Sequence, residues 1–444
     1  MKSNLKLAIN AALLTGTALT LNTASATDKA LLDTLLSNGS INQVQYAKLA
    51  KSEPKASSSS LSGIKMSLDK KGLRFASADK AFKMKIGGRF HLQTGYHVGA
   101  EDFEHTDGTE VRRARLHVKG VLWKDWKYVA EFDFADNKVV IKDLSTTYKG
   151  LDWLQITVGH QKQNMSMELQ ESSNDIMFIE RSAVNSLTEK TFNRALGLHF
   201  KSAAKDWSAQ FAIYGDSTDD NKSAGNEGWG LSGRGTYTPI NTKNNVLHLG
   251  AAVGFRGMDA GKVKLGYETT HMSNLNLTKA SIGDVNGMTM GIMELAYMRG
   301  PFSIQSEYAH MWLARDAGQS GLNFDAWYVQ AAWTLTGESR SYKGSDGEFK
   351  RLKPSQEFGL SEGSGWGAVE LAIRYDESDL QSGDIMGGTE KAVTVAANWY
   401  LNQNIRLMAD YRTAFDVSAR DGIPSGNGIE DDVHAFTGRI QLTF

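Results

Sequence analysis

The sequence predicts an all-β fold, a sixteen-stranded antiparallel transmembrane β-barrel preceded by a short helical segment. Three observations lead to this prediction. Apolar and polar residues alternate strictly over many segments, glycine and aromatic residues are abundant while proline is rare, and short polar turns alternate with long polar loops. Strands that cross a membrane as a barrel carry this alternation, because one face meets lipid and the other meets the lumen.

The segment 83–98 gives the clearest alternation. Its even positions are apolar or small, and its odd positions carry Lys, Arg, His or Gln apart from two glycines. Sixteen residues of period two are long enough to cross a bilayer at a tilt. The segment 434–444 repeats the pattern and ends on Phe444.

Comparable alternation recurs along the rest of the chain, for example at 126–134, 207–214, 247–256, 327–335 and 393–401. We count sixteen or seventeen such segments from about residue 83 onward. Closed single-chain bacterial barrels have an even number of strands, so we expect sixteen. A soluble β-sandwich would also alternate, but its strands are usually shorter. Trp and Tyr near many segment ends favour the membrane barrel, whose interfaces carry aromatic girdles.

The first residues have the pattern of an export signal. Lys2 and Lys6 precede a short, interrupted apolar run, and Ala24-Ser25-Ala26 supplies the small residues that a signal peptidase reads. The apolar run is too short for a membrane-spanning helix. We therefore expect a signal peptide over residues 1–26.

A helical segment follows the signal. A Leu-rich stretch ends at Gly39, a second helical stretch begins where Asn42 can cap it, and a serine run follows. This leader is either a periplasmic appendage or oligomer contact, or a partly ordered connection. We expect leader and Ser-rich linker over residues 27–60 and the barrel over residues 61–444.

Composition excludes several classes of function. The chain has 49 Lys and Arg against 50 Asp and Glu, and export would remove two of the lysines, so a nucleic-acid partner is not expected. Cysteine is absent, which excludes disulfides, thiol catalysis and cysteine metal sites.

Motifs for chemistry are weak. Gly359-Leu-Ser-Glu-Gly363 has the spacing of a nucleophile elbow, but it lies in a Gly/Ser-rich loop and not at a strand-to-helix turn. The acidic stretch 421–432 is read as a solvated loop in preference to a cation site. We therefore expect no catalytic residue, no metal and no cofactor. A barrel enzyme and a non-conducting surface or adhesive protein remain as rivals.

Six short pieces spread over nearly the whole mature chain form a recognisable set: Lys85–Phe90, Val111–Leu116, Asp125–Tyr128, Asn245–Gly250, Trp333–Lys343 and Asn398–Tyr400. Together they resemble the phosphate-selective porin O/P family, and Leu-Thr-Gly-Glu-x-Arg at 335–340 is the most specific piece. The resemblance implies a homotrimeric outer-membrane porin embedded in lipid, with loops folded into the channel. It also implies a ladder of basic residues that draws small anions such as phosphate inward. The terminal Phe444 resembles the signal that barrel assembly machinery recognises.

The candidate site of such a protein is a row of cations along the passage. By parity, Arg89 points to the lumen, as do Arg113 and Arg115 if the register holds, whereas Arg112 needs a bulge to turn inward. Seven residues are expected to line the anion path: Arg89, Arg112, Arg113, Arg115, Arg256, Lys262 and Lys264. By family likeness all of these except Arg115 and Arg256 match ladder positions. Five more basic residues in a long loop are expected to form a funnel through which anions enter: Arg340, Lys343, Lys350, Arg351 and Lys353.

One loop departs from the family pattern. Residues 160–193 carry five acids, Glu168, Glu171, Asp175, Glu180 and Glu189, against the cations Lys162, Arg181 and Lys190. Leu169 and Asn174 stand where the family places lysine. An acidic constriction would repel phosphate, so a cation-leaning or neutral-solute porin on the same barrel stays open as the alternative.

Overall fold

The computed structural model describes residues 36–40, 42, 43, 46, 60, 61, 63–69, 72–99, 106–217, 227–268, 273, 275–316, 318–361, 364–418 and 432–444. The chain divides into one unit over 1–59 and another over 60–444. In the first unit, the amide of Tyr46 donates to the carbonyl of Asn42 at 2.8 Å, and Gly39 has a φ of 78°. The expected signal peptide and most of the expected linker lie outside the described residues.

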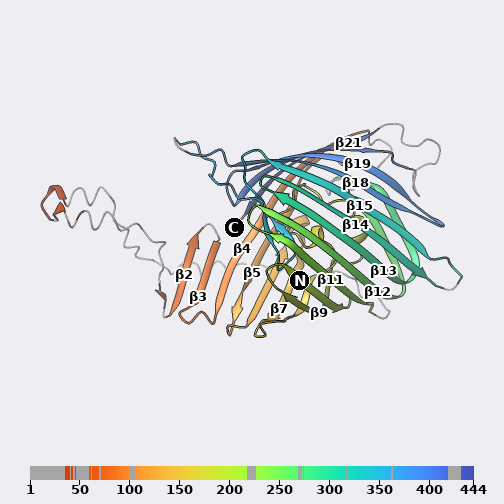
Figure 1. Cartoon of the computed structure of the whole chain (residues 1–444), viewed down its shortest axis with the longest axis horizontal. Helices are drawn as coiled ribbons and strands as arrows, with labels where there is room; N and C mark the ends of the chain where they lie inside the picture. Colours follow the sequence, from red (N-terminus) through yellow and green to blue (C-terminus); the bar gives the residue numbers. More distant parts are fainter. Residues whose placement is uncertain are drawn as a thin grey trace, which may run out of the picture. The chain divides into compact units, whose positions relative to one another are not determined.

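Sixteen strands of the described chain close into one antiparallel barrel (Figure 1). They are β4 (Lys83–Val98), β5 (Gly108–Leu122), β6 (Trp126–Asp133), β7 (Val140–Tyr148), β8 (Gln155–Lys162), β9 (Arg194–Ala203), β10 (Trp207–Tyr214), β11 (Trp229–Asn241), β12 (Asn245–Glu268), β13 (Asn276–Arg299), β14 (Phe302–Arg315), β15 (Leu322–Thr334), β18 (Ala368–Ser382), β19 (Ile385–Tyr400), β20 (Ile405–Phe415) and β21 (Val433–Thr443). Each strand pairs with the next, and β21 returns to pair with β4. The predicted fold class and strand number are confirmed.

Three short strands precede β4 and continue the sheet next to the β21–β4 seam. These are β1 (Ser60–Leu61), β2 (Ile64–Asp69) and β3 (Gly72–Ser77). The range expected for the barrel, 61–444, includes these residues apart from Ser60. β3 pairs with the first residues of β4, where Leu73 lies opposite Ile86. From Gly88 onward, β4 pairs instead with the C-terminal residues, beginning with Phe444. The closed barrel therefore begins at β4, and β2 and β3 continue its sheet beyond the seam (Figure 1).

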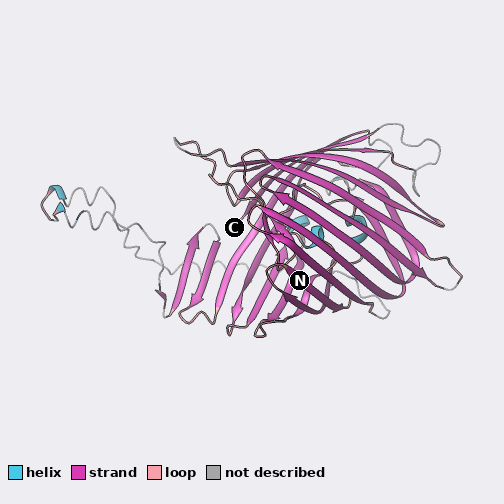
Figure 2. Cartoon of the chain, viewed as in Figure 1, coloured by secondary structure: helices cyan, strands magenta, loops and turns pink. Residues whose placement is uncertain are grey.

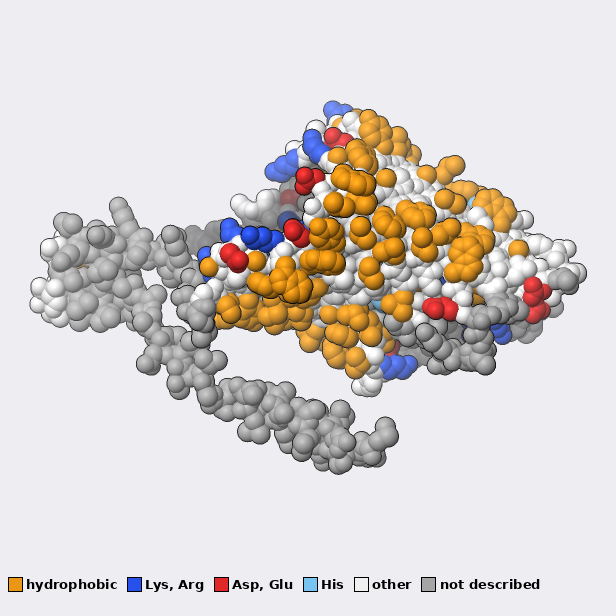
Figure 3. All heavy atoms as spheres, turned by 90° about the horizontal axis from the view of Figure 1, so that it is seen from below, with side chains coloured by type: hydrophobic (Ala, Val, Ile, Leu, Met, Phe, Trp, Pro, Cys, Tyr) orange, Lys and Arg blue, Asp and Glu red, His pale blue; other side chains and the backbone are white. Residues whose placement is uncertain are grey.

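The alternation places apolar side chains on the outside of the barrel. Phe90, Leu116, Trp312 and Trp333 are among the exposed large hydrophobic residues, and Figure 3 shows such side chains spread over the outer face. Lipid is the solvent that accommodates this surface. None of the helices in the described part of the chain is long and apolar enough to cross a membrane.

The two ends of the barrel differ. Turns such as 123–125, 204–206 and 300–301 lie at the end where the chain terminates, which is the periplasmic end by the rule for outer-membrane barrels. Several longer connections lie at the opposite, external end, whereas the long connection between β15 and β18 lies at the periplasmic end. Besides the 3-10 turn η1 (Ala135–Asn137), helices occur in the connection between β8 and β9, where α4 (Met167–Gln170) and α5 (Asn185–Thr188) lie inside the barrel (Figure 2).

This connection, residues 163–193, is called the inner loop below. Its side chains Met165, Val184, Leu187 and Phe192 are buried against inward-facing apolar residues of the long strands β12 to β15. The wall residues include Ile282, Met288, Met290, Ile292, Met311, Leu313 and Phe324. Burying each such side chain stabilises the docked loop by about 1.5–3 kcal/mol. The side of the barrel interior next to β12 to β15 is therefore filled by a hydrophobic core, and the open lumen lies on the other side of the loop.

Candidate functional site

Wall carboxylates bind the backbone of the inner loop. Glu307 on β14 accepts the amide of Met167 at 2.7 Å. Asp410 on β20 accepts the amide of Ile179, and Asp376 on β18 accepts that of Ala183, both also at 2.7 Å. The loop amides thus donate to carboxyl groups on strands far away in the sequence.

Buried arginines bind the loop carbonyls in the same way. Arg406 donates to the carbonyl of Ile176 at 2.9 Å, and Arg439 donates to that of Ile179 at 2.7 Å. Arg374 donates to the carbonyl of Glu180 at 3.1 Å. A buried charge is tolerated when it is hydrogen-bonded, so these contacts fix the loop on β14 and on β18 to β21.

Two acids of the inner loop, Glu168 and Glu171, are buried and do not face the lumen. Glu168 accepts the amide of Ser182 at 3.0 Å, and Glu171 lies 4.0 Å from Arg340. Burial raises the pKa of Glu171 to about 8. The sequence-based expectation of an acidic constriction therefore does not hold for these two carboxyls.

Glu180 is also engaged. Its Oε1 lies 3.2 Å from Nε of Arg112 and 3.0 Å from Nη2 of Arg439. Burial alone would raise the pKa of Glu180, but the nearby arginines outweigh burial and hold the pKa below its usual range. The carboxylate is thus ionised, and its charge is compensated by the two arginines.

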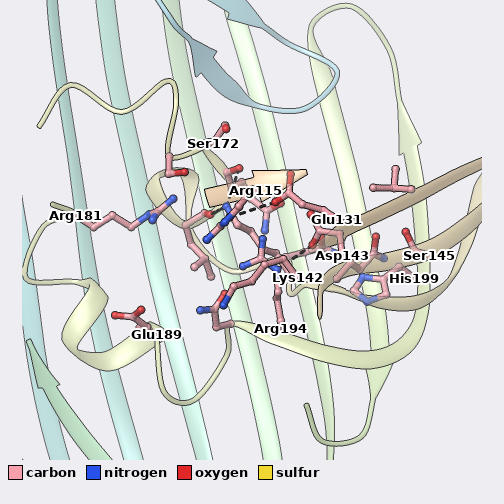
Figure 4. A pocket seen from close by; sticks show the side chains of 18 of the residues that line it. Arg115, Glu131, Lys142, Asp143, Ser145, Ser172, Arg181, Glu189, Arg194 and His199 are labelled. Carbon is pink, nitrogen blue, oxygen red and sulfur yellow. Dashed lines mark hydrogen bonds and ion pairs between the residues drawn. The ribbon is translucent and has the colours of Figure 1, made fainter. Parts of the chain in front are cut away.

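A cavity of about 540 Å³ separates the inner loop from strands β4 to β10 (Figure 4). Among the described residues that line it, ten are basic: Arg89, Arg112, Arg113, Arg115, Lys142, Lys162, Arg181, Lys190, Arg194 and Lys201. Four are acidic: Glu131, Asp143, Glu189 and Glu268. Basic side chains outnumber acidic ones around this cavity, so it is electropositive.

The four predicted residues near the start of the barrel all line this cavity. Arg89 donates to the hydroxyl of Ser173 at 3.0 Å and to Glu131 at 2.8 Å. Arg115 donates to Asp133 at 2.6 Å and to Glu131 at 3.2 Å. These two guanidiniums are thus oriented by carboxylates of β6.

Arg112 reaches the lumen because β5 contains a bulge. His91 on β4 lies opposite Arg113, but the next residue, Leu92, lies opposite Val111, so Arg112 is left out of the pairing. Two consecutive arginines can therefore point inward. This is the bulge that the parity argument required.

Arg113 differs from its neighbours in having no carboxylate partner. Its side chain is buried, with 4% of the residue exposed, and its hydrogen bond goes to Nδ1 of His91 at 3.5 Å. Its Nε has no hydrogen-bond partner, and in the described part of the chain no carboxylate oxygen lies within 4.0 Å of it. A buried guanidinium without a counter-ion is costly, so this position is suited to hold an anion.

A second, smaller pocket of about 250 Å³ holds the other three predicted cations, Arg256, Lys262 and Lys264. Lys190 lines both this pocket and the larger cavity. Arg256 also donates to the carbonyl of Thr191 at 2.9 Å, so it fixes the end of the inner loop. All seven predicted residues thus line one of two basic pockets that share a lysine. Lys262 and Lys264 are nevertheless exposed and alternate with the inward-facing Val263 and Leu265, so their side chains lie on the other face of β12.

The second predicted cluster lies at the periplasmic end, in the connection between β15 and β18. A hairpin of β16 (Ser341–Lys343) and β17 (Glu348–Lys350) folds into the barrel there. Arg234 binds Glu294 through two bonds of 2.7 Å and donates to the carbonyl of Gly347, which fixes the hairpin. The expected funnel therefore belongs to the mouth opposite the external loops.

The five residues of this cluster are not equivalent. Arg340 is buried and donates to the carbonyl of Asp175 at 3.2 Å, and Arg351 donates to Thr443 at 2.9 Å. Lys350 is paired with Glu348. Only Lys343 and Lys353 of the five are exposed. The elbow-like motif lies in the same connection, and its last residues, 362 and 363, are outside the described residues.

Several lining cations were not among the predicted site residues. Lys142 lies at another bulge, since Glu131 pairs with Asp143 while Phe132 pairs with Ile141. Arg181, Arg194 and Lys201 also line the cavity, and Figure 4 shows Arg181 reaching from the loop toward the group around Arg115. Strand alternation carries no signal for a bulge or a loop residue, so only three-dimensional placement reveals these.

Lys162 has a different role from the other lining cations. Its Nζ donates to the carbonyls of Leu169 at 2.5 Å and of Glu171 at 3.1 Å. The ammonium group thus holds the turn that follows α4, and its charge is shared with backbone oxygens.

Comparison with known proteins agrees with this architecture. The chain is 28% identical to Porin O of Pseudomonas aeruginosa over 413 residues, which cover 84% of this chain and 91% of that protein. It is 30% identical to an uncharacterized protein of Caulobacter vibrioides over 390 residues, 84% of this chain and 76% of that one. A loop-deletion mutant of OmpT, an outer membrane protein of Vibrio cholerae, shares the fold with a TM-score of 0.55 at 12% identity, covering 82% of this chain and all of that one. The model of the family "Phosphate-selective porin O and P" matches residues 84–444, and the chain is accordingly a member of this family of outer-membrane porins.

Proposed function

We propose that this porin is a water-filled channel for passive diffusion of small anions such as phosphate, guided by lumenal Arg and Lys. The observation that carries the proposal is Arg113, a buried guanidinium with no carboxylate within ion-pair distance among the described residues. Arg112 and Arg115 line the same cavity beside it. A permeating oxyanion supplies the missing counter-charge and accepts the hydrogen bonds that guanidinium groups offer bidentately.

The two basic pockets support a route through the channel. The smaller pocket lies along the part of β12 that runs toward the external end, so an anion from that side can reach Arg256 there. Lys190 lines both pockets, so it can pass the anion to the larger cavity. Several weak sites in series permit both entry and release, as conduction requires.

The cation-leaning alternative rested on the acids of the inner loop. Glu168, Glu171 and Glu180 each lie within 4.0 Å of an arginine, which leaves the basic side chains in excess around the cavity. This arrangement favours anions over cations and neutral solutes. A measurement of ion current through the purified protein also distinguishes a porin from a purely adhesive barrel, which would not conduct.

The test is the reversal potential of the purified protein in a planar bilayer under a KCl gradient, followed by phosphate titration at fixed chloride. We expect a reversal potential of the anion-selective sign and a chloride current that phosphate blocks at low concentration. A cation-selective potential would overturn the proposal. Anion selectivity without phosphate block would retain the anion channel and reject phosphate as its preferred solute.

We also propose export by the signal at 1–26, insertion by barrel assembly machinery that reads the strand ending at Phe444, and function as a homotrimer. A helical leader over 27–60 would then lie in the periplasm. Support comes from Ala24-Ser25-Ala26 and from family membership. Mass determination of the native protein in detergent tests the trimer, and N-terminal sequencing tests cleavage after Ala26.

A further inference from the structure

Three of the four carboxylates of the large cavity, Glu131, Asp143 and Glu189, are not electrostatically equivalent. Glu131 accepts hydrogen bonds from Arg89 at 2.8 Å and from Arg115 at 3.2 Å. Asp143 accepts one from Arg194 at 2.9 Å. The charges of these two carboxylates are therefore compensated by direct arginine partners, and they serve to orient those arginines.

Glu189 stands in a different environment. It follows α5 at the end of the helix, is exposed, and lines the cavity. Its carboxylate accepts a hydrogen bond from the neutral amide of Asn185 at 2.7 Å. Within the described ranges of the chain, no Lys or Arg nitrogen lies within 4.0 Å of it. Its negative charge thus acts on the passage without a direct ion-pair partner.

The position of Glu189 lies on the proposed route. The next residue, Lys190, lines both basic pockets, so Glu189 is at the junction that an anion must pass. Figure 4 shows Glu189 on the same loop as Arg181, across the cavity from the strand-borne cations. A negative charge at this junction is not needed to hold the loop, which is fixed by Glu307, Asp376 and the wall arginines described above.

We propose that Glu189 is a specificity-determining residue that makes the channel prefer singly charged anions over doubly charged ones. The proposal rests on the anion-channel function proposed above. Repulsion by a fixed charge grows in proportion to the charge of the permeating ion. A unit charge about 8 Å away in water lowers the local concentration of a singly charged anion about 2.4-fold and that of a doubly charged anion about sixfold. The ratio of the two permeabilities therefore depends on this carboxylate.

The experiment measures the sulfate-to-chloride permeability ratio from bi-ionic reversal potentials at one pH and one low ionic strength. Sulfate stays doubly charged, so the ratio reports ion charge directly. Glu189→Gln keeps the size of the side chain and its acceptor for Asn185, and removes only the charge. We expect it to raise the ratio about two- to threefold, with a smaller rise at high salt because screening weakens the interaction.

Two further variants control the result. Lys190→Gln removes the neighbouring positive charge and should lower the ratio. Asp152→Asn makes the same charge change as Glu189→Gln on an exposed periplasmic turn outside both pockets and should leave the ratio unchanged. An unchanged ratio in Glu189→Gln, or an equal change in Asp152→Asn, would overturn the role of Glu189. A cation-selective wild type would instead overturn the anion-channel function itself, so the two failures are distinguishable.

Discussion

Nη2 of Arg439 on the last strand lies 3.0 Å from Oε1 of Glu180 on the inner loop. The same carboxylate oxygen lies 3.2 Å from Nε of Arg112 on β5. One loop carboxylate therefore binds strands on both sides of β4, next to the seam that closes the barrel. The loop is therefore held beside Arg112 and Arg113, two of the proposed anion ligands of the large cavity.

Glu180→Gln should loosen this part of the loop. Breaking a buried ion pair by neutralising one partner costs about 3–5 kcal/mol. We expect a cysteine placed at buried Ile179 to be labelled faster in this variant, and the single-channel current to become noisier. The chain has no cysteine of its own, so labelling reports this position alone. Glu189→Gln is the matched control, and equal labelling rates in the two variants would contradict the anchoring role.

Glu171 should make the docked state sensitive to pH. Its pKa is raised by burial to about 8 from 4.5, so the folded protein binds this proton more tightly than the unfolded chain does. The contribution to stability is then fully present below about pH 4.5 and is lost as the pH rises toward 8. We expect the thermal unfolding midpoint in detergent to fall over this window, and to fall less in Glu171→Gln. An identical pH dependence in both proteins would reject this origin.

Arg89→Glu should reduce anion current more at low salt than at high salt. The Debye length is about 10 Å at 0.1 M and about 3 Å at 1 M ionic strength, so the lumenal field is screened in concentrated salt. Arg299→Glu is the matched control, because Arg299 is exposed at the end of β13 and lines neither pocket. Selectivity that is the same in Arg89→Glu as in the wild type at both salt concentrations would remove Arg89 from the path.

Lys162→Met should make the conductance unstable, and this effect should not depend on salt concentration. Lys162 binds the carbonyls of Leu169 and Glu171, so its loss leaves backbone acceptors unpaired rather than removing a free charge from the passage. We expect unstable conductance at both low and high salt. A purely salt-dependent loss of anion selectivity, as expected for Lys190→Gln, would show that Lys162 is a lumenal ligand instead.

The barrel could be predicted because period-two alternation is a local property of the sequence. The segment read as 83–98 is β4, and all seven predicted path cations line a basic pocket. The orientation of Arg112 and Lys142 could not be predicted with certainty, because a bulge reverses parity without any residue type that marks it.

The acidic inner loop shows a second limit of sequence reasoning. Its acids were counted as lumenal charges, but whether Glu168 or Glu180 faces the lumen depends on wall residues such as Arg374 and Arg439, which lie about two hundred residues or more away in the chain. The hairpin of β2 and β3 was likewise included in the barrel, since alternation does not say where a sheet closes on itself.

Because the inner loop docks mainly on one side of the barrel, substitutions that affect its docking can be separated from substitutions that change the charge of the cavity. Strands β14 and β18 to β21 bind the loop through buried carboxyl groups and arginines, whereas β4 to β10 line the cavity and contact the loop through Arg89, Arg112 and Lys162. Charges on β4 to β10 other than Arg89, Arg112 and Lys162, which bind the loop, can thus be redesigned for sulfate, carboxylates or other solutes while the loop stays docked. The strands that hold the loop can therefore stay constant while the other lumenal side chains of β4 to β10 vary. Varying those side chains alone would give a library of channels with different solute selectivity.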